Sequence, residues 1–181
     1  MKKYVVLAAV IVIAAATVVV MTQNFSRLRG ALSGSNEVPY VSTQGTGDFD
    51  ARVSEDGAAI EYTLNYSNMQ GTVSQAHIHI AQKNVNGGIS VWLCGNPTAG
   101  PPPINPPTGT PLCESPSDTF TGTITAANVV GPAGQGVASG EFDELLEAIR
   151  SGNAYVNVHS SLAPGGEIRA QIGTHNSDHS H

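Results

Sequence analysis

Short segments in which apolar and polar residues alternate recur along this chain, and they restrict its fold more than any other feature. The clearest is IEYTLNY at 60–66, where four apolar residues share one face: Ile60, Tyr62, Leu64 and Tyr66. A period of two is typical of an antiparallel strand with one buried face. We therefore expect the chain to be built mainly from half-buried β-strands.

The strand-like segments are separated by turn residues, such as Asp56-Gly57. We expect eight strands, near residues 29–33, 46–53, 59–66, 73–80, 88–93, 119–125, 154–159 and 166–172. The 20 glycines and 11 prolines among 181 residues agree with many turns. Together these features predict an all-β fold, a Greek-key antiparallel β-sandwich of about eight strands.

One segment breaks the strand pattern. In GEFDELLEAIRSG (140–152), apolar residues recur at helical spacing, acidic residues come early and Arg150 comes late. Acidic side chains suit the positive end of a helix dipole and a basic one suits the negative end. The pattern predicts a short amphipathic helix near 141–150 that covers a sheet edge or an open end of the core.

The N-terminal part differs in kind from the rest. Lys2 and Lys3 precede an apolar run from Tyr4 to Met21, which is typical of either a cleaved secretory signal or an uncleaved membrane anchor. Both alternatives export the remainder, and we favour the anchor. The expected organisation is a signal peptide or membrane anchor at 1–22, a linker at 23–28, a folded domain at 29–173 and a disordered tail at 174–181.

Charge and cysteine content limit the partners and the compartment. The net charge is −6 and no basic stripe is present, which argues against a nucleic-acid partner. Cys94 and Cys113 flank a loop rich in proline and glycine. In an exported chain such a pair predicts a disulfide, and the loop lacks the further donors that a thiolate metal site needs. No feature identifies a protein partner.

Three histidines are the main candidates for a functional site. In AHIHI (76–80), His77 and His79 face away from the apolar side of the strand. They should lie roughly 6.5–7 Å apart along it. In YVNVH (155–159), His159 also faces away from the apolar side. If the two strands are neighbours, the three imidazoles could hold one metal ion, copper in preference to zinc.

Other interpretations of these residues stay open. The histidines could be ordinary polar positions on an exposed sheet face. Asn157, Glu167 and Arg169 could support the imidazoles from the same face, whereas Glu167 and Arg169 could instead form a surface ion pair of little energetic weight. Three more histidines lie in the tail and could capture an ion: His175, His179 and His181. No catalytic residue is predicted, because no nucleophile with a base and no paired acids are found.

Four blocks resemble the successive signatures of the CHRD domain, a module named after chordin: LSGSNEVP (32–39), AHIHIA (76–81), AYVNVHS (154–160) and PGGEIRAQI (164–172). They occur in order and span about residues 29–173. The resemblance implies an extracytoplasmic β-rich module without an established general activity. In chordin, growth-factor binding is associated with separate cysteine-rich repeats. Those repeats do not occur here, so that function is not carried over.

A weaker similarity is to the copper/zinc superoxide dismutases, which are also Greek-key sandwiches. His77, His79, His159 and Arg169 follow the order of that family's His-x-His strand, later histidine and arginine. The histidine that bridges the two metals and the zinc loop have no counterpart, so a two-metal enzyme is not expected. We expect an exported, membrane-anchored binding module that holds one copper ion. The alternatives are a metal-free interaction module and a single-copper redox enzyme.

Overall fold

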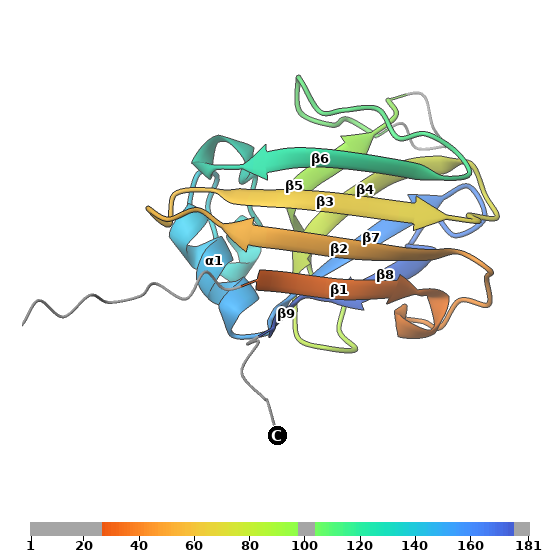
Figure 1. Ribbon diagram of the computed structural model, residues 1–181, viewed down its shortest axis with the longest axis horizontal. Coiled ribbons are helices and arrows are strands. Elements are labelled where there is room, and N and C mark those ends of the chain that lie inside the picture. Colours follow the sequence, from red (N-terminus) through yellow and green to blue (C-terminus); the bar gives the residue numbers. More distant parts are fainter. Residues whose placement is uncertain (1–26, 98–103, 176–181) are drawn as a thin grey trace, which may run out of the picture.

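The computed structural model describes residues 27–97 and 104–175, and within them the chain forms nine strands and one α-helix (Figure 1). The strands are β1 (Arg27–Ser33), β2 (Thr46–Val53), β3 (Ile60–Ser67), β4 (Val73–Ile80), β5 (Gly88–Gly95), β6 (Asp118–Ile124), β7 (Ala154–Ser160), β8 (Ile168–Gln171) and β9 (Gly173–His175). Eight of them lie where the alternation predicted. The short β9 was not expected as a separate strand.

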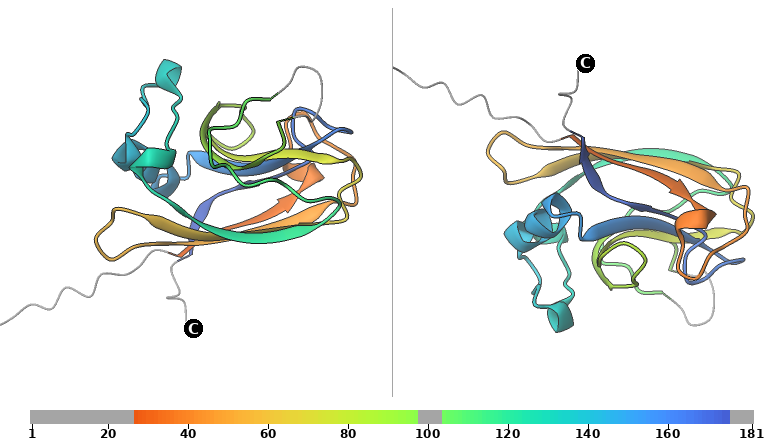
Figure 2. Two further views of the ribbon diagram at one scale, coloured as in Figure 1. Left: turned by 90° about the horizontal axis from the view of Figure 1, so that it is seen from above. Right: turned by 90° about the horizontal axis from the view of Figure 1, so that it is seen from below.

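All strand pairs are antiparallel, in the order β5-β4-β7-β8-β1-β2-β3-β6, with β9 pairing β1. The sheet folds over into two layers, with β5, β4, β7 and β8 in one and β1, β2, β3 and β6 in the other (Figures 1 and 2). The layers are joined where β1 meets β8 and β9. The links from β3 to β4 and from β5 to β6 cross between them. The predicted Greek-key sandwich is therefore confirmed, as one nearly closed sheet.

The core lies between the layers and is built by strand alternation. The predicted face of β3 is buried along its whole length. Ile78 of β4 and Val156 and Val158 of β7 belong to the same apolar cluster. Burying one such side chain contributes about 1.5–3 kcal/mol. A polar substitution on this face is therefore expected to be far more damaging than one on the exposed face of β2 or β3.

Helix α1 (Phe142–Arg150) closes one end of the sandwich (Figures 1 and 2). Its apolar stripe is buried in the common core: Phe142, Leu145, Leu146 and Ile149. Asp143 and Glu144 lie in the first turn and Arg150 in the last, as the dipole favours. Of the two placements predicted for the helix, covering an open end of the core is the one observed.

The ends of the folded domain differ slightly from the expected boundaries. Strand β1 begins at Arg27, inside the predicted linker, and β9 pairs Thr174 and His175 with β1. These two residues therefore belong to the sheet and not to the tail. The expected leader, most of the linker, and His179 and His181 lie outside the described residues. Among the helices within 27–97 and 104–175, none has the length and apolarity to cross a bilayer.

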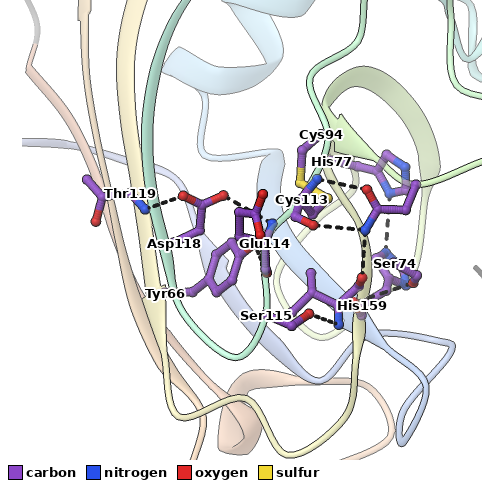
Figure 3. The surroundings of a disulfide bond; sticks show 12 residues. Tyr66, Ser74, His77, Cys94, Cys113, Glu114, Ser115, Asp118, Thr119 and His159 are labelled. Atoms are coloured by element: carbon purple, nitrogen blue, oxygen red, sulfur yellow. Dashed lines mark hydrogen bonds between the residues drawn. A yellow bond between two sulfur atoms is a disulfide. The ribbon is translucent and has the colours of Figure 1, made fainter.

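The predicted disulfide joins Cys94 of β5 to Cys113, with 5.3 Å between their Cα atoms (Figure 3). Asn96 stabilises the same region. Its side chain accepts a bond from the Cys113 amide and donates to the Cys113 carbonyl, both at 2.9 Å, and donates to the Val73 carbonyl at 3.0 Å. The loop that follows β5 is thus held against the beginning of β4 by both a covalent bond and a bridging amide.

Replacing Cys94 and Cys113 together with serine should lower the free energy of unfolding by about 3 kcal/mol, because the bond closes a loop of 19 residues in sequence separation. Urea unfolding monitored by circular dichroism measures this difference. Adding reductant should destabilise the unmodified chain and leave the double variant unchanged. An equal response of both would show that the disulfide does not carry the effect.

Candidate metal centre

The pairing of β4 with β7 brings the three histidines together. In the register of this pair, His77 lies opposite Asn157, His79 opposite Tyr155 and Gln75 opposite His159. His159 is therefore diagonal to His77 on the same face. The ring centroid of His77 lies 5.3 Å from that of His79 and 5.0 Å from that of His159. One nitrogen from each ring lies within 4.8 Å of the other two.

These histidines are buried, so the alternative of ordinary polar positions on an exposed sheet face is wrong. Their exposed fractions are 0% for His77, 7% for His79 and 6% for His159. Strand parity did place them opposite the core residues Ala76 and Ile78. That opposite face, however, is covered by loops instead of solvent. Parity says which face a side chain takes and nothing about what covers that face.

The covering loops are bonded to each other and to the sheet. One carries Glu37 and Val38, another runs from β4 to β5, and a third joins β7 to β8. The Asn86 side chain of the second loop donates to the Val38 carbonyl of the first at 2.8 Å. The third loop contributes the Pro164 carbonyl, which lies 2.9 Å from Nδ1 of His159. The loops therefore form a lid of fixed backbone groups over the imidazoles.

A backbone carbonyl sets the tautomer of His79, and a second backbone carbonyl contacts His159. Nδ1 of His79 lies 2.9 Å from the Gly87 carbonyl, and Nδ1 of His159 lies equally close to that of Pro164. A carbonyl can only accept, so Nδ1 of His79 carries the proton and Nε2 of His79 holds a lone pair when the ring is neutral. The His159 ring lies between two acceptor oxygens, the Pro164 carbonyl at Nδ1 and Asn157 Oδ1 at 3.0 Å from Nε2, and either of its nitrogens can carry the proton. A carbonyl behind Nδ1 is the usual support of a metal-binding histidine.

His77 completes the set. Its Nδ1 lies 3.2 Å from Nε2 of His159, within hydrogen-bond distance. Within the described residues, Nε2 of His77 and Nε2 of His79 are buried and have no hydrogen-bond partner. A buried polar atom without a partner typically costs about 1–3 kcal/mol. A cation accepting these lone pairs would remove that cost, so the chemistry of the donor set fits a metal ion.

Burial keeps the rings neutral. It lowers the pKa of His77 to about 2 and that of His79 to about 4, and it also lowers the pKa of His159. The neighbouring imidazoles add to the effect at His77. Only neutral imidazole binds a metal ion, so at neutral pH the three rings need not lose a proton first.

Aromatic and cationic side chains enclose the imidazoles. The Tyr155 ring stacks on His79 with 4.7 Å between centroids, and the Arg169 guanidinium lies 3.4 Å from the centre of the Tyr155 ring. The half-buried Trp92 of β5 contacts His77 edge-on at 4.2 Å. Oδ1 of Asn157 lies 3.0 Å from Nε2 of His159. Of the predicted supporting residues, Asn157 touches an imidazole directly and Arg169 acts through Tyr155.

Glu167 and Arg169 do not form the surface ion pair that was one alternative. Arg169 is 1% exposed and donates to the Val85 carbonyl at 2.8 Å and to Asn86 Oδ1 at 3.0 Å. The buried Glu167 carboxylate accepts from Thr43, Ser160 and the amides of Gln70 and Gly71. It therefore ties three segments together and makes no hydrogen bond to the imidazoles.

Glu37 is a buried acid that sequence reasoning missed as a site residue. Its Oε1 has no hydrogen-bond partner within the described residues, and desolvation raises its pKa to about 7. A side chain at Gly166 would collide with this carboxyl group and with the Asn157 amide, so Glu37 lies against the same lid. The only signal was its place in the block LSGSNEVP, where alternation predicts nothing about burial.

The histidines and Glu37 predict opposite pH dependences of stability. The folded histidines have pKa values below the ordinary 6.5, so as the pH falls below about 6.5 the unfolded chain binds more protons and stability falls. The folded Glu37 has a raised pKa, so between about 7 and its ordinary 4.5 falling pH increases stability. The three histidines together outweigh the single Glu37, so stability falls overall. Each proton bound by only one of the two states changes the unfolding free energy by about 1.4 kcal/mol per pH unit.

Urea unfolding between pH 7.5 and 5.0 tests these signs. The unmodified chain should lose stability toward pH 5. The loss should be smaller in His79→Gln and larger in Glu37→Gln, because each substitution removes one of the opposing groups. Identical slopes in all three chains would mean that neither group titrates differently in the folded state.

Comparison with known proteins agrees with the quoted sequence blocks. The family model of the CHRD domain matches residues 28–172, which covers the helix, the histidine centre and all of the sheet except Arg27 and β9. No curated protein and no solved structure matches the chain. The disulfide and the family are compatible with an extracellular location. Because the match covers most of its length, the chain belongs to the CHRD domain family.

Proposed function

We propose that this CHRD domain is an exported binding module that holds one copper ion through His77, His79 and His159. The observation that supports it most is the convergence of three neutral imidazoles, two of which have buried Nε2 atoms without a partner. A metal with bonds near 2 Å needs its three nitrogens about 3.5 Å apart. In this structure the three ligand nitrogens lie within 4.8 Å of one another, so binding would bring them closer together.

The surroundings support retention of an ion in preference to turnover of a substrate. The rings are almost completely buried, and the lid over them is held by backbone and side-chain hydrogen bonds. A redox enzyme would need a path for its substrate to the metal, which this degree of burial disfavours. Anchoring by the N-terminal segment and capture of the ion by the tail histidines belong to the same proposal.

Metal retention by a tail variant tests the proposal. The chain has six histidines, so replacing His175, His179 and His181 with asparagine leaves only the three of the centre. This full-length variant is first freed of metal with a chelator. In equilibrium dialysis against copper it should then bind one copper ion per chain. The single tryptophan, Trp92, contacts His77, so its fluorescence should change at the same stoichiometry.

The matched control adds His79→Gln to the tail variant. This substitution removes one metal ligand at a position that is not part of the apolar core. The affinity for copper should fall at least about 100-fold, because losing a ligand weakens metal binding at least as much as losing a residue that supports a ligand. Bound copper at 100 times its dissociation constant should also raise the unfolding free energy of the tail variant by about 2.7 kcal/mol. If the folded tail variant retained neither copper nor zinc at micromolar concentration, a metal-free interaction module would replace the proposal.

A further inference from the structure

The donor set of the centre is entirely neutral. Within the described residues, the cluster of close ligand atoms contains three imidazoles and no carboxylate or thiolate. Both cysteines are joined in the disulfide. The Glu167 carboxylate is engaged by four donors elsewhere. An ion bound here would therefore keep its full charge, without an anionic ligand to reduce it.

The surroundings penalise a high charge. The solvation cost of moving an ion out of water rises with the square of its charge, so a dication costs about four times as much as a monocation in the same buried place. The Arg169 guanidinium adds a positive charge, because it lies on the opposite face of the Tyr155 ring that stacks on His79. Arg169 forms no salt bridge within the described residues, although the Glu37 carboxyl is close enough to interact with it electrostatically.

The three imidazoles are also closely surrounded by other side chains. Tyr155 covers one face of His79, Trp92 contacts His77 edge-on, and Asn157 approaches His159. Zinc in proteins is almost always four-coordinate, with a water in the fourth position when only three side chains bind. Cu(II) prefers tetragonal sites with at least four donors. Monovalent copper, with a filled d shell, is satisfied by three nitrogen ligands and needs no water.

From these observations we infer that the centre selects Cu(I), bound by one nitrogen from each of the three histidines, and that Arg169 contributes to discrimination against divalent ions. The inference rests on the proposed copper-binding function and specifies the oxidation state of its ligand. In this arrangement Tyr155 has no chemical role of its own. It separates the guanidinium from the imidazole.

Competition with chromophoric chelators measures the selectivity. The full-length tail variant is titrated with Cu(I) under ascorbate against a Cu(I) chelator, and with Zn(II) against a zinc indicator. Cu(I) should bind at least about 100-fold more tightly than Zn(II). X-ray absorption of the Cu(I) form should show three nitrogen ligands and no oxygen. Tighter binding of Zn(II), or a fourth oxygen ligand, would overturn the inference while leaving metal binding intact. Absence of all binding would instead refute the proposed function.

Two substitutions of Arg169 separate its charge from its packing. Arg169→Gln removes the charge and should narrow the ratio of Cu(I) to Zn(II) affinity by roughly 10-fold. Arg169→Lys keeps the positive charge but offers fewer hydrogen-bond donors. It should preserve most of the ratio of Cu(I) to Zn(II) affinity. Circular dichroism and urea unfolding establish that each variant is folded. An unchanged ratio in a folded Arg169→Gln chain would exclude the electrostatic role assigned to Arg169.

Discussion

The antiparallel pairing of β4 with β7 is the interaction on which the rest of this structure depends. Its inner face supplies Ile78, Val156 and Val158 to the core, and its outer face supplies the three imidazoles. Because side chains alternate along both strands, one register determines both sets at once. A slip by one residue would place the histidines in the core and the aliphatic residues under the lid. The apolar core therefore enforces the geometry of the polar centre.

The quoted sequence blocks supply residues that build the lid over the histidines. Glu167 binds Thr43, Ser160 and two amides of the β3–β4 turn, so a single carboxylate connects three segments. Gly166 has φ of +129° and lies against Glu37 and Asn157, where no side chain would fit. Arg169 reaches the β4–β5 loop and stacks on Tyr155. These blocks thus contain the residues that assemble the cover over β4 and β7, as well as the histidines beneath it.

Much of the fold could be predicted from local patterns. Alternation located eight strands, helical spacing located α1, and two cysteines in an exported chain indicated the disulfide. Each of these signals depends on residues that are close in sequence or on a simple count. The predicted neighbours β4 and β7 were a conditional expectation. Only the structure shows that β4 and β7 pair, because strand pairing is decided by long-range packing that no local period encodes.

The sequence by itself determined which residue types face which side of each strand, and so indicated the three histidines, with Asn157, Glu167 and Arg169, as candidates for one polar site. Only the tertiary structure decided that this set is buried, because the loops that cover it come from distant parts of the chain. The same long-range packing supplies the carbonyls of Gly87 and Pro164, the edge of Trp92 and the carboxyl group of Glu37. Burial follows from what packs above a face, and periodicity along a strand carries no information about that.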